Sequence, residues 1–208
     1  MSSWGTAHAS ATNKPKFLPT DENSKYTRAD CMATESGWVM RAGTSATGNG
    51  NASADHEVLV AIGGLAGATD TTGLRAPTAT SMRFVIGTAS TTDLTAGSSA
   101  QTIQVEITWD EGVTVAGSPT LAIANGNQGT GSGRGPYTLV YTATGSTANR
   151  KRFTLASQTI AANDVLTIGG ANIALAGGTI SDTVRGGTAQ AASLVLSGLT
   201  AVTHTVLA

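Results

Sequence analysis

The sequence predicts an all-β fold, an antiparallel β-sandwich preceded by an extended N-terminal arm and a short β region. Three observations lead to this prediction. Residues 102–109 alternate strictly between apolar and polar side chains, which is typical of a strand that covers a core on one face. Short apolar runs recur about every ten residues, with turn residues between them. The 208 residues include 26 glycines and only 12% are charged, which suits short strands and tight turns better than long helices.

The first 36 residues are polar and irregular. Pro15 and Pro19 favour an extended path and disfavour a helix. We therefore expect an arm, either mobile or laid across a neighbour. Two short strands follow at 37–41 and 57–62, joined by a long loop of small and polar residues. The predicted domains are residues 1–75, with the arm and the short strands, and residues 76–208, with the sandwich.

From residue 82 onward the pattern is one strand after another. The alternating run places Ile103, Val105, Ile107 and Trp109 on one face. Gly, Pro and acidic residues mark turns between the runs. The predicted strands are 82–86, 102–109, 113–115, 120–124, 137–141, 152–155, 165–168, 173–175, 194–196 and the alternating tail 200–208.

The charge pattern argues against a nucleic-acid partner. The formal net charge is −1, and the charges are dispersed along the chain. The one local cluster, Arg150–Lys151–Arg152, is a short triplet that we interpret as a solvated turn. Nucleic-acid binding normally requires an extended basic surface, so no nucleic-acid partner is expected.

Cysteine content and hydropathy indicate where the protein is made and how it is stabilised. Cys31 is the only cysteine, so no intramolecular disulfide can form, and stability outside a cell must come from packing or oligomerisation. No window approaches the roughly 20 apolar residues of a membrane helix, so no membrane partner is expected. The start, MSSWGTAHASATNKPK, has no apolar stretch of the signal-peptide type. We expect synthesis in a cytoplasm.

The sequence offers no constellation for catalysis or for a cofactor. His8, His56 and His204 stand in unrelated contexts, and a single cysteine cannot complete a typical zinc site. No Gly-x-Ser-x-Gly elbow anchors a hydrolase triad. The glycine-rich loop 125–136 precedes a strand instead of a helix, so a hairpin loop is favoured over a phosphate site.

Four acidic residues at strand ends are candidate calcium ligands. They are Asp110, Glu111, Asp164 and Asp182. Calcium requires several oxygens that converge at short range, and the chain has no dense Asp-x-Asp-x-Asp run. We interpret the four as solvated turn acids and predict no metal site.

The aromatic residues fall into two groups. Trp109, Tyr137 and Tyr141 share faces with apolar neighbours, so core packing is favoured over carbohydrate stacking. Trp4 and Phe17 lie in the polar arm, where no local core exists. They are expected either to anchor in a partner's pocket or to dock onto the protein's own sandwich. The candidate residues for assembly and interaction are Trp4, Phe17, Tyr26 and Trp38.

Three segments of the later chain carry a family resemblance. They are VEITWDEGVTVAGSPTLAI, YTLVYTATG and ALAGGTISDTV, all between Gln101 and Leu196. They resemble the bacterial Ig-like repeats of large surface proteins and adhesins, which run from a strand and an acidic turn to a G-G-T-I-x-D segment. The resemblance covers roughly half of the chain. It implies an Ig-like β-sandwich for residues 76–208 and no particular activity.

Three segments near the start carry a second resemblance. NKPKFLPTDEN, ATESGWVMRAGT and HEVLVAIGGL occur in this order between residues 4 and 66. They resemble the opening of structural (virion) proteins of marine cyanophages and related tailed phages. The resemblance implies a virion component made in the host cytoplasm. Such a protein needs no signal peptide, because lysis releases the finished particle.

Together the two resemblances imply a non-enzymatic virion structural protein, most directly a capsid decoration (cement) protein. Residues 1–75 would attach it to the major capsid protein or to another virion subunit, and the Ig-like domain would be displayed. The symmetry of a shell favours a homo-oligomer, for example a trimer. Two alternatives stay open. One is an adhesion module that binds glycans or a host surface through loops such as 125–136, and the other is a neck or tail component.

Overall fold

The computed structural model describes residues 28–43, 50–66, 76–85, 94, 101–127, 136–158, 160–182 and 189–207. The chain divides into two compact units. Unit 1 comprises Met1–Thr80, Thr108–Thr114 and Ile180–Ser193, and unit 2 comprises Ser81–Ile107, Val115–Thr179 and Leu194–Ala208. This division differs from the single boundary expected after residue 75, because two later segments group with the N-terminal part.

The described elements are almost all strands, which confirms the prediction of an all-β antiparallel fold. One short 3-10 helix precedes the first strand. The elements are η2 (Arg28–Asp30), β1 (Cys31–Thr34), β2 (Gly37–Met40), β3 (Glu57–Ala61), β4 (Ala79–Phe84), β5 (Gln101–Trp109), β6 (Val113–Ala116), β7 (Thr120–Asn127), β8 (Tyr137–Thr142), β9 (Arg150–Gln158), β10 (Asp164–Ile168), β11 (Ile173–Ala174), β12 (Thr179–Asp182) and β13 (Val202–Thr205).

Unit 1 is built on a three-stranded antiparallel sheet in the order β1-β2-β3. β1 and β2 form a tight hairpin, in which Thr34 pairs with Gly37. Gly37 has a φ of 124°, and a Cβ added there would lie 2.1 Å from the carbonyl oxygen of Val60. Only glycine fits this position, because a side chain would push β3 off the hairpin.

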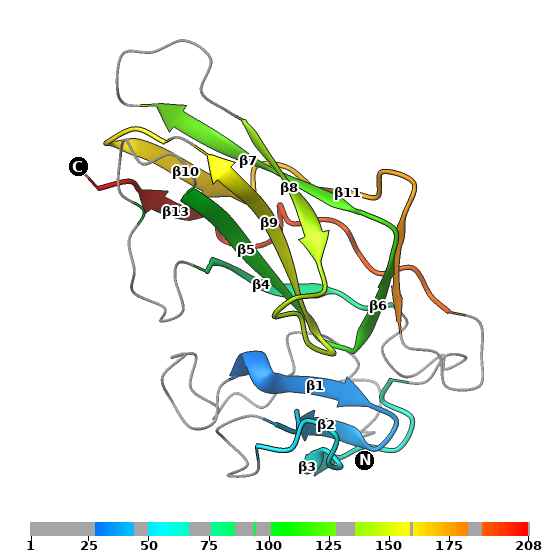
Figure 1. Ribbon diagram of the computed structural model, residues 1–208. Helices are drawn as coiled ribbons and strands as arrows, with labels where there is room; N and C mark the ends of the chain where they lie inside the picture. Colours follow the sequence, from blue (N-terminus) through cyan, green and yellow to red (C-terminus); the bar gives the residue numbers. More distant parts are fainter. Residues whose placement is uncertain are drawn as a thin grey trace. The chain divides into compact units, whose positions relative to one another are not determined.

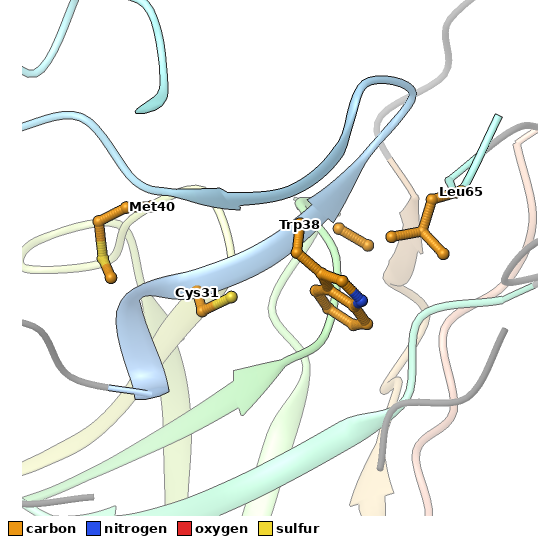
Figure 2. Close-up of a cluster of buried hydrophobic side chains, with 5 residues drawn as sticks. Cys31, Trp38, Met40 and Leu65 are labelled. Carbon is orange, nitrogen blue, oxygen red and sulfur yellow. The ribbon is translucent and has the colours of Figure 1, made fainter. Parts of the chain in front are cut away.

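The core of this sheet is a cluster of buried side chains. It comprises Cys31, Ala33, Trp38, Met40 and Leu65. The Trp38 indole is its largest member, 2% exposed, and Figure 2 shows it together with Cys31, Met40 and Leu65. Half-buried side chains from the third strand and the turn after it pack against the cluster, namely Leu59, Val60, Ile62 and Ala66.

Unit 2 is built on a nearly closed barrel. Its strands hydrogen-bond in the order β13-β10-β7-β8-β9-β5-β4, and β11 also pairs with β7. Figure 1 shows these strands curving around one another. The expectation of a plain two-sheet sandwich is therefore wrong. One continuous ladder runs from β13 to β4, whereas a sandwich would divide the strands between two separately bonded sheets.

The two end strands of the ladder approach each other through side chains. Phe84 of β4 and His204 of β13 lie with their ring centroids 5.9 Å apart. Gly169, just after β10, leaves space for Met82 of β4, whose terminal methyl carbon would lie 2.6 Å from an added Cβ. We call this line between β4 and β13 the seam.

The prediction that the apolar face of residues 102–109 lies in a core is confirmed. The expectation that this strand is covered on one face only is wrong, because Glu106 and Thr108 on the other face are 2% and 3% exposed. Ile103, Val105, Ile107 and Trp109 are each 0% exposed. The prediction that Trp109 and Tyr137 pack in a core is also confirmed, because Tyr137 is only 9% exposed. Further buried apolar side chains of the barrel strands are Leu121, Ile123, Leu139, Phe153, Leu166 and Ile168.

Three strand assignments failed. β1 and β12 were not predicted, and the strand expected at residues 194–196 is irregular. Its backbone groups are bonded to β11 and to the residue before β11: the Leu194 carbonyl accepts a hydrogen bond from the Ile173 amide, and the Leu196 amide donates to the Asn172 side chain. An apolar run satisfied in this way need not join a ladder.

Candidate functional site

The predicted interaction residues have different places in the structure. Trp4, Phe17 and Tyr26 lie outside the described residues. Trp38 lies on β2 with its ring in the buried cluster of unit 1 (Figure 2). Its contribution to assembly therefore stays a prediction, and in this structure its role is to hold the hairpin and β3 together.

Among the described residues of unit 1, the exposed large apolar side chain lies on β3. This strand lies at the end of the sheet order and pairs with β2. Val58 is 49% exposed, and Glu57 and Ala61 are exposed as well. The register between β2 and β3 shifts between Trp38 and Val39, so the strand carries a β-bulge. We call β3 with its outward side chains the β3 edge.

A second feature of unit 1 is the stretch Thr108–Thr114, which lies far along the chain from the sheet. The Ala33 amide donates to the Asp110 carbonyl oxygen at 2.6 Å, and Ala33 forms a parallel bridge with Glu111. The Asp110 side chain accepts from the Thr78 amide at 2.7 Å. The Trp109 indole donates to the Ser193 carbonyl oxygen at 3.3 Å. This stretch thus fastens separate parts of unit 1 together.

Glu111 is the unusual group in that stretch. It is 6% exposed, and its Oε1 has no hydrogen-bond partner among the described residues. Burial, with the nearby charges of Asp110 and Asp182, raises the pKa of Glu111 to about 8. At neutral pH the carboxyl is therefore mostly protonated, because burial among like charges disfavours the ionised form.

The interpretation of the strand-end acids as solvated is wrong for three of the four. Asp110 and Asp164 are 0% exposed, and Glu111 is 6% exposed. Asp164 accepts hydrogen bonds from the Asn125 side chain and the Ala161 amide, each at 3.2 Å, so it closes the turn before β10. Asp182 is half-buried, and its Oδ1 accepts from the Gln190 amide at 2.9 Å.

Unit 2 contains a buried ionic network around Glu106 of β5. Glu106 pairs with Arg83 of β4 at 2.9 Å, with Arg150 of β9 at 3.4 Å and with Arg152 of β9 at 3.3 Å. These strands are neighbours in the sheet order β9-β5-β4. The Glu106 side chain is 2% exposed, and those of Arg83, Arg150 and Arg152 are 28%, 9% and 27% exposed. The network therefore crosses three strands of the barrel wall.

The basic triplet at 150–152 is accordingly not a solvated turn, and that interpretation is wrong. The triplet opens strand β9. Arg150 and Lys151 are 7% and 8% exposed. The Lys151 Nζ donates to the Thr147 carbonyl oxygen at 2.6 Å, and burial lowers the pKa of Lys151 to about 8. The side chains of Arg150 and Lys151 are therefore buried in the barrel wall and do not face water.

His56 and His204 lie among the described residues, and both have contacts within the fold. His56 accepts a hydrogen bond from the Ala42 amide through Nδ1 at 3.1 Å, and His204 packs on Phe84. His8 and most of the loop 125–136 lie outside the described residues. Within the described ranges, no group of three or more His, Cys, Asp or Glu side chains could hold a metal ion. No helix in the same ranges is long and apolar enough to cross a membrane.

Comparisons with known proteins give no relative. The chain matches no protein-family model, no curated protein and no solved structure. The functional argument therefore depends on the residues themselves.

Proposed function

We propose that the protein is a non-enzymatic structural component of a tailed-phage virion, most directly a capsid decoration protein. It attaches through residues 1–75 and displays the β-rich remainder of the chain. The resemblance of residues 4–66 to virion proteins supports the phage setting. The observation that supports attachment most directly is the β3 edge, where Val58 is 49% exposed.

The β3 edge has the chemistry of an assembly surface. An edge strand presents backbone amides and carbonyls that can pair with a strand of another subunit. Exposed apolar side chains such as Val58 add a surface that is stabilised by burial, at about 25 cal/mol per Å². The β-bulge distorts the edge and so disfavours uncontrolled pairing between free copies. These properties suit a partner with a defined surface, such as the major capsid protein or another virion subunit.

The displayed body is the barrel of unit 2. We include in the proposal that the stretch from Gln101 to Leu196 is related to bacterial Ig-like repeats, since its motifs resemble theirs. We also propose a homo-oligomer, with a trimer as the first expectation, because a shell offers symmetric binding sites. Neither nucleic acid nor a membrane is a proposed partner. Decoration would stabilise the shell by burying surface between subunits.

The test uses two matched valine substitutions and intact particles. Val58→Lys places a charge on the β3 edge, whereas Val140→Lys places one on β8 at a valine that is 38% exposed. We expect cryo-EM of the particles to show the protein on the capsid surface. Occupancy should fall at least about tenfold for Val58→Lys, which corresponds to roughly 1.4 kcal/mol of binding free energy. Val140→Lys should bind like the wild type.

Other outcomes would reassign the protein. Density at the neck or tail would replace decoration with a role at that position. Particles that lack the protein but keep their heat and osmotic stability would rule out a cement role. Substitutions in the loop 125–136 that abolish host attachment but leave assembly intact would favour the adhesion module.

A further inference from the structure

Glu111 lies where stretches distant in sequence meet inside unit 1. It forms a bridge with Ala33 of β1. The carbonyl oxygen of the residue before it, Asp110, accepts a hydrogen bond from the Ala33 amide, and the Asp110 amide donates one to the Thr78 carbonyl oxygen. The Ser193 amide in turn donates to the Pro77 carbonyl oxygen at 2.7 Å. A change in the position of Glu111 would therefore alter the hydrogen bonds that connect its stretch to β1, to residues 76–78 and to residues 189–193.

The charged groups around Glu111 are of one sign among the described residues that act on it. Asp110 comes from its own stretch, and Asp182 comes from β12. On β1 the titratable side chain is the Cys31 thiol, and no residue of Cys31–Thr34 is charged. Asp30, just before β1, is paired with Arg41 at 3.0 Å. The stretch 76–78, Ala-Pro-Thr, has no titratable side chain.

We propose that Glu111 is a pH-sensitive lock, whose protonated carboxyl keeps the stretch Thr108–Thr114 closed on β1 and whose ionised carboxylate loosens that attachment. The protonated group can stay buried without a counter-charge. The carboxylate cannot, because its Oε1 has no described donor and its neighbours are acids. It must gain water or move outward, and both motions strain the bridge to Ala33.

The direction of the pH dependence follows from the shift. The pKa of Glu111 is raised from an ordinary value of 4.5 to about 8. The stability that the lock contributes is therefore fully present below about pH 4.5 and decreases as the pH rises to 8. Above that value the folded carboxyl is itself ionised. The attachment should then be loose.

The test measures hydrogen exchange of the Ala33 amide, which donates to Asp110 at 2.6 Å. Its protection factor is compared at pH 6.5 and pH 9.5, so that the intrinsic pH dependence of exchange cancels. We expect protection in the wild type to fall by at least about tenfold, because each pH unit between the ordinary pKa of 4.5 and the raised pKa of about 8 favours the open, ionised form tenfold. Glu111→Gln should keep constant protection over the same range.

Two further variants sharpen the test. Asp182→Asn removes a repelling charge but keeps an oxygen for the Gln190 amide, so the midpoint of the change should move to lower pH. Glu57→Gln alters an exposed glutamate of β3 and should leave the wild-type profile unchanged. If Glu111→Gln does not fold, the ¹³C shift of the Glu111 carboxyl in the wild-type protein supplies the readout.

Three results would overturn the proposal. One is a Glu111 carboxyl that titrates near pH 4.5. Another is a loss of Ala33 protection that persists in Glu111→Gln. The third is stabilisation by added calcium at pH 6.5 that requires Glu111, because this would show an ionised, cation-binding carboxylate where the lock requires a proton.

Discussion

Glu106 and Glu111 belong to different units of the protein, yet both are glutamates removed from water, 2% and 6% exposed. Glu106 is surrounded by three guanidinium groups from two neighbouring strands. Glu111 has two aspartates beside it, and the pKa of its carboxyl is raised to about 8. Burial alone thus does not decide how a carboxyl behaves.

The difference lies in what compensates the loss of water. A buried carboxylate is tolerated when donors and opposite charges replace its hydration. Where they are missing, the group keeps its proton. Glu106 is therefore a structural ion whose removal should be costly. Glu111 is mostly a neutral acid in the folded protein at neutral pH, and it becomes ionised there only under alkaline conditions.

The largest expected effect is that of Glu106→Gln. The substitution removes the negative charge from three arginines, one of which has a side chain only 9% exposed. Breaking a buried ion pair on one side costs about 3 kcal/mol. Urea denaturation followed by circular dichroism should show this loss in the free energy of unfolding. Glu57→Gln, at an exposed glutamate, is the control, and a loss below about 1 kcal/mol for Glu106→Gln would contradict the network's role.

Next in size is the contrast between two arginines of β9. Arg150→Met should cost about 2 kcal/mol, since this side chain is 9% exposed, whereas Arg152→Met should cost less than about 1 kcal/mol, since that side chain is 27% exposed and screened by water. Repeating the denaturation at high salt should reduce the Arg152 effect more than the Arg150 effect. Equal losses in the free energy of unfolding would show that exposure does not determine how much each arginine's ion pair with Glu106 contributes.

A smaller effect should appear when Glu111 is given the partner that Glu106 has. Asp182→Lys places an ammonium where a carboxylate now repels Glu111, and Asp182→Ala is its control because both lose the acceptor for Gln190. At pH 9 the lysine variant should be more stable than the alanine variant by about 1 kcal/mol. At pH 6 the two should be alike, since Glu111 is then neutral. Thermal unfolding at both pH values provides the measurement.

A further effect, which appears only in the pH dependence of stability, is expected at Lys151, whose pKa is lowered by burial to about 8 from 10.5. The folded state favours the neutral amine, so Lys151 makes the free energy of unfolding rise as the pH increases from 8 to 10.5. This is opposite in sign to the Glu111 effect. Lys151→Met should remove the rise, although it also loses the bond to Thr147. If the free energy of unfolding changed with pH in the same way in the wild type and in Lys151→Met, the lowered pKa of Lys151 would be contradicted.

Local patterns of apolar side chains predicted several strands correctly. β5 was found from its alternation, and Glu57–Ala61 and Thr120–Asn127 from short apolar runs. β1 was missed because Cys31, Met32 and Ala33 are all buried, which leaves no alternation to detect. Closure of the main sheet was also missed, since it depends on β4 and β13, which lie at opposite ends of the unit 2 sequence.

The charged residues were predicted less well, and the reason is their long-range partners. Glu106 sits on the polar face of an alternating strand, which by itself indicates a solvated side chain. Its partners are 23, 44 and 46 residues away in the sequence. The residues next to Glu106 therefore do not predict the ionic network. Glu111 gave no signal either. The burial that raises its pKa comes from the way distant stretches fold over it.

The seam between β4 and β13 has a mechanical consequence. β13 has four residue pairs with β10 on one side, and on the other side it meets β4 through the Phe84–His204 contact. A force applied at residue 207 and directed across the sheet would first break the backbone bond of Leu207 to Leu94 and the bonds of Val206 to the turn before β10 and to the first residue of that strand. The β10 pairs would then break one after another. β5 and β9, which have a hydrogen-bonded strand on each side, would have to lose two ladders. Under such a load the barrel should open by peeling off its last strand, at low force and with most of its wall still intact.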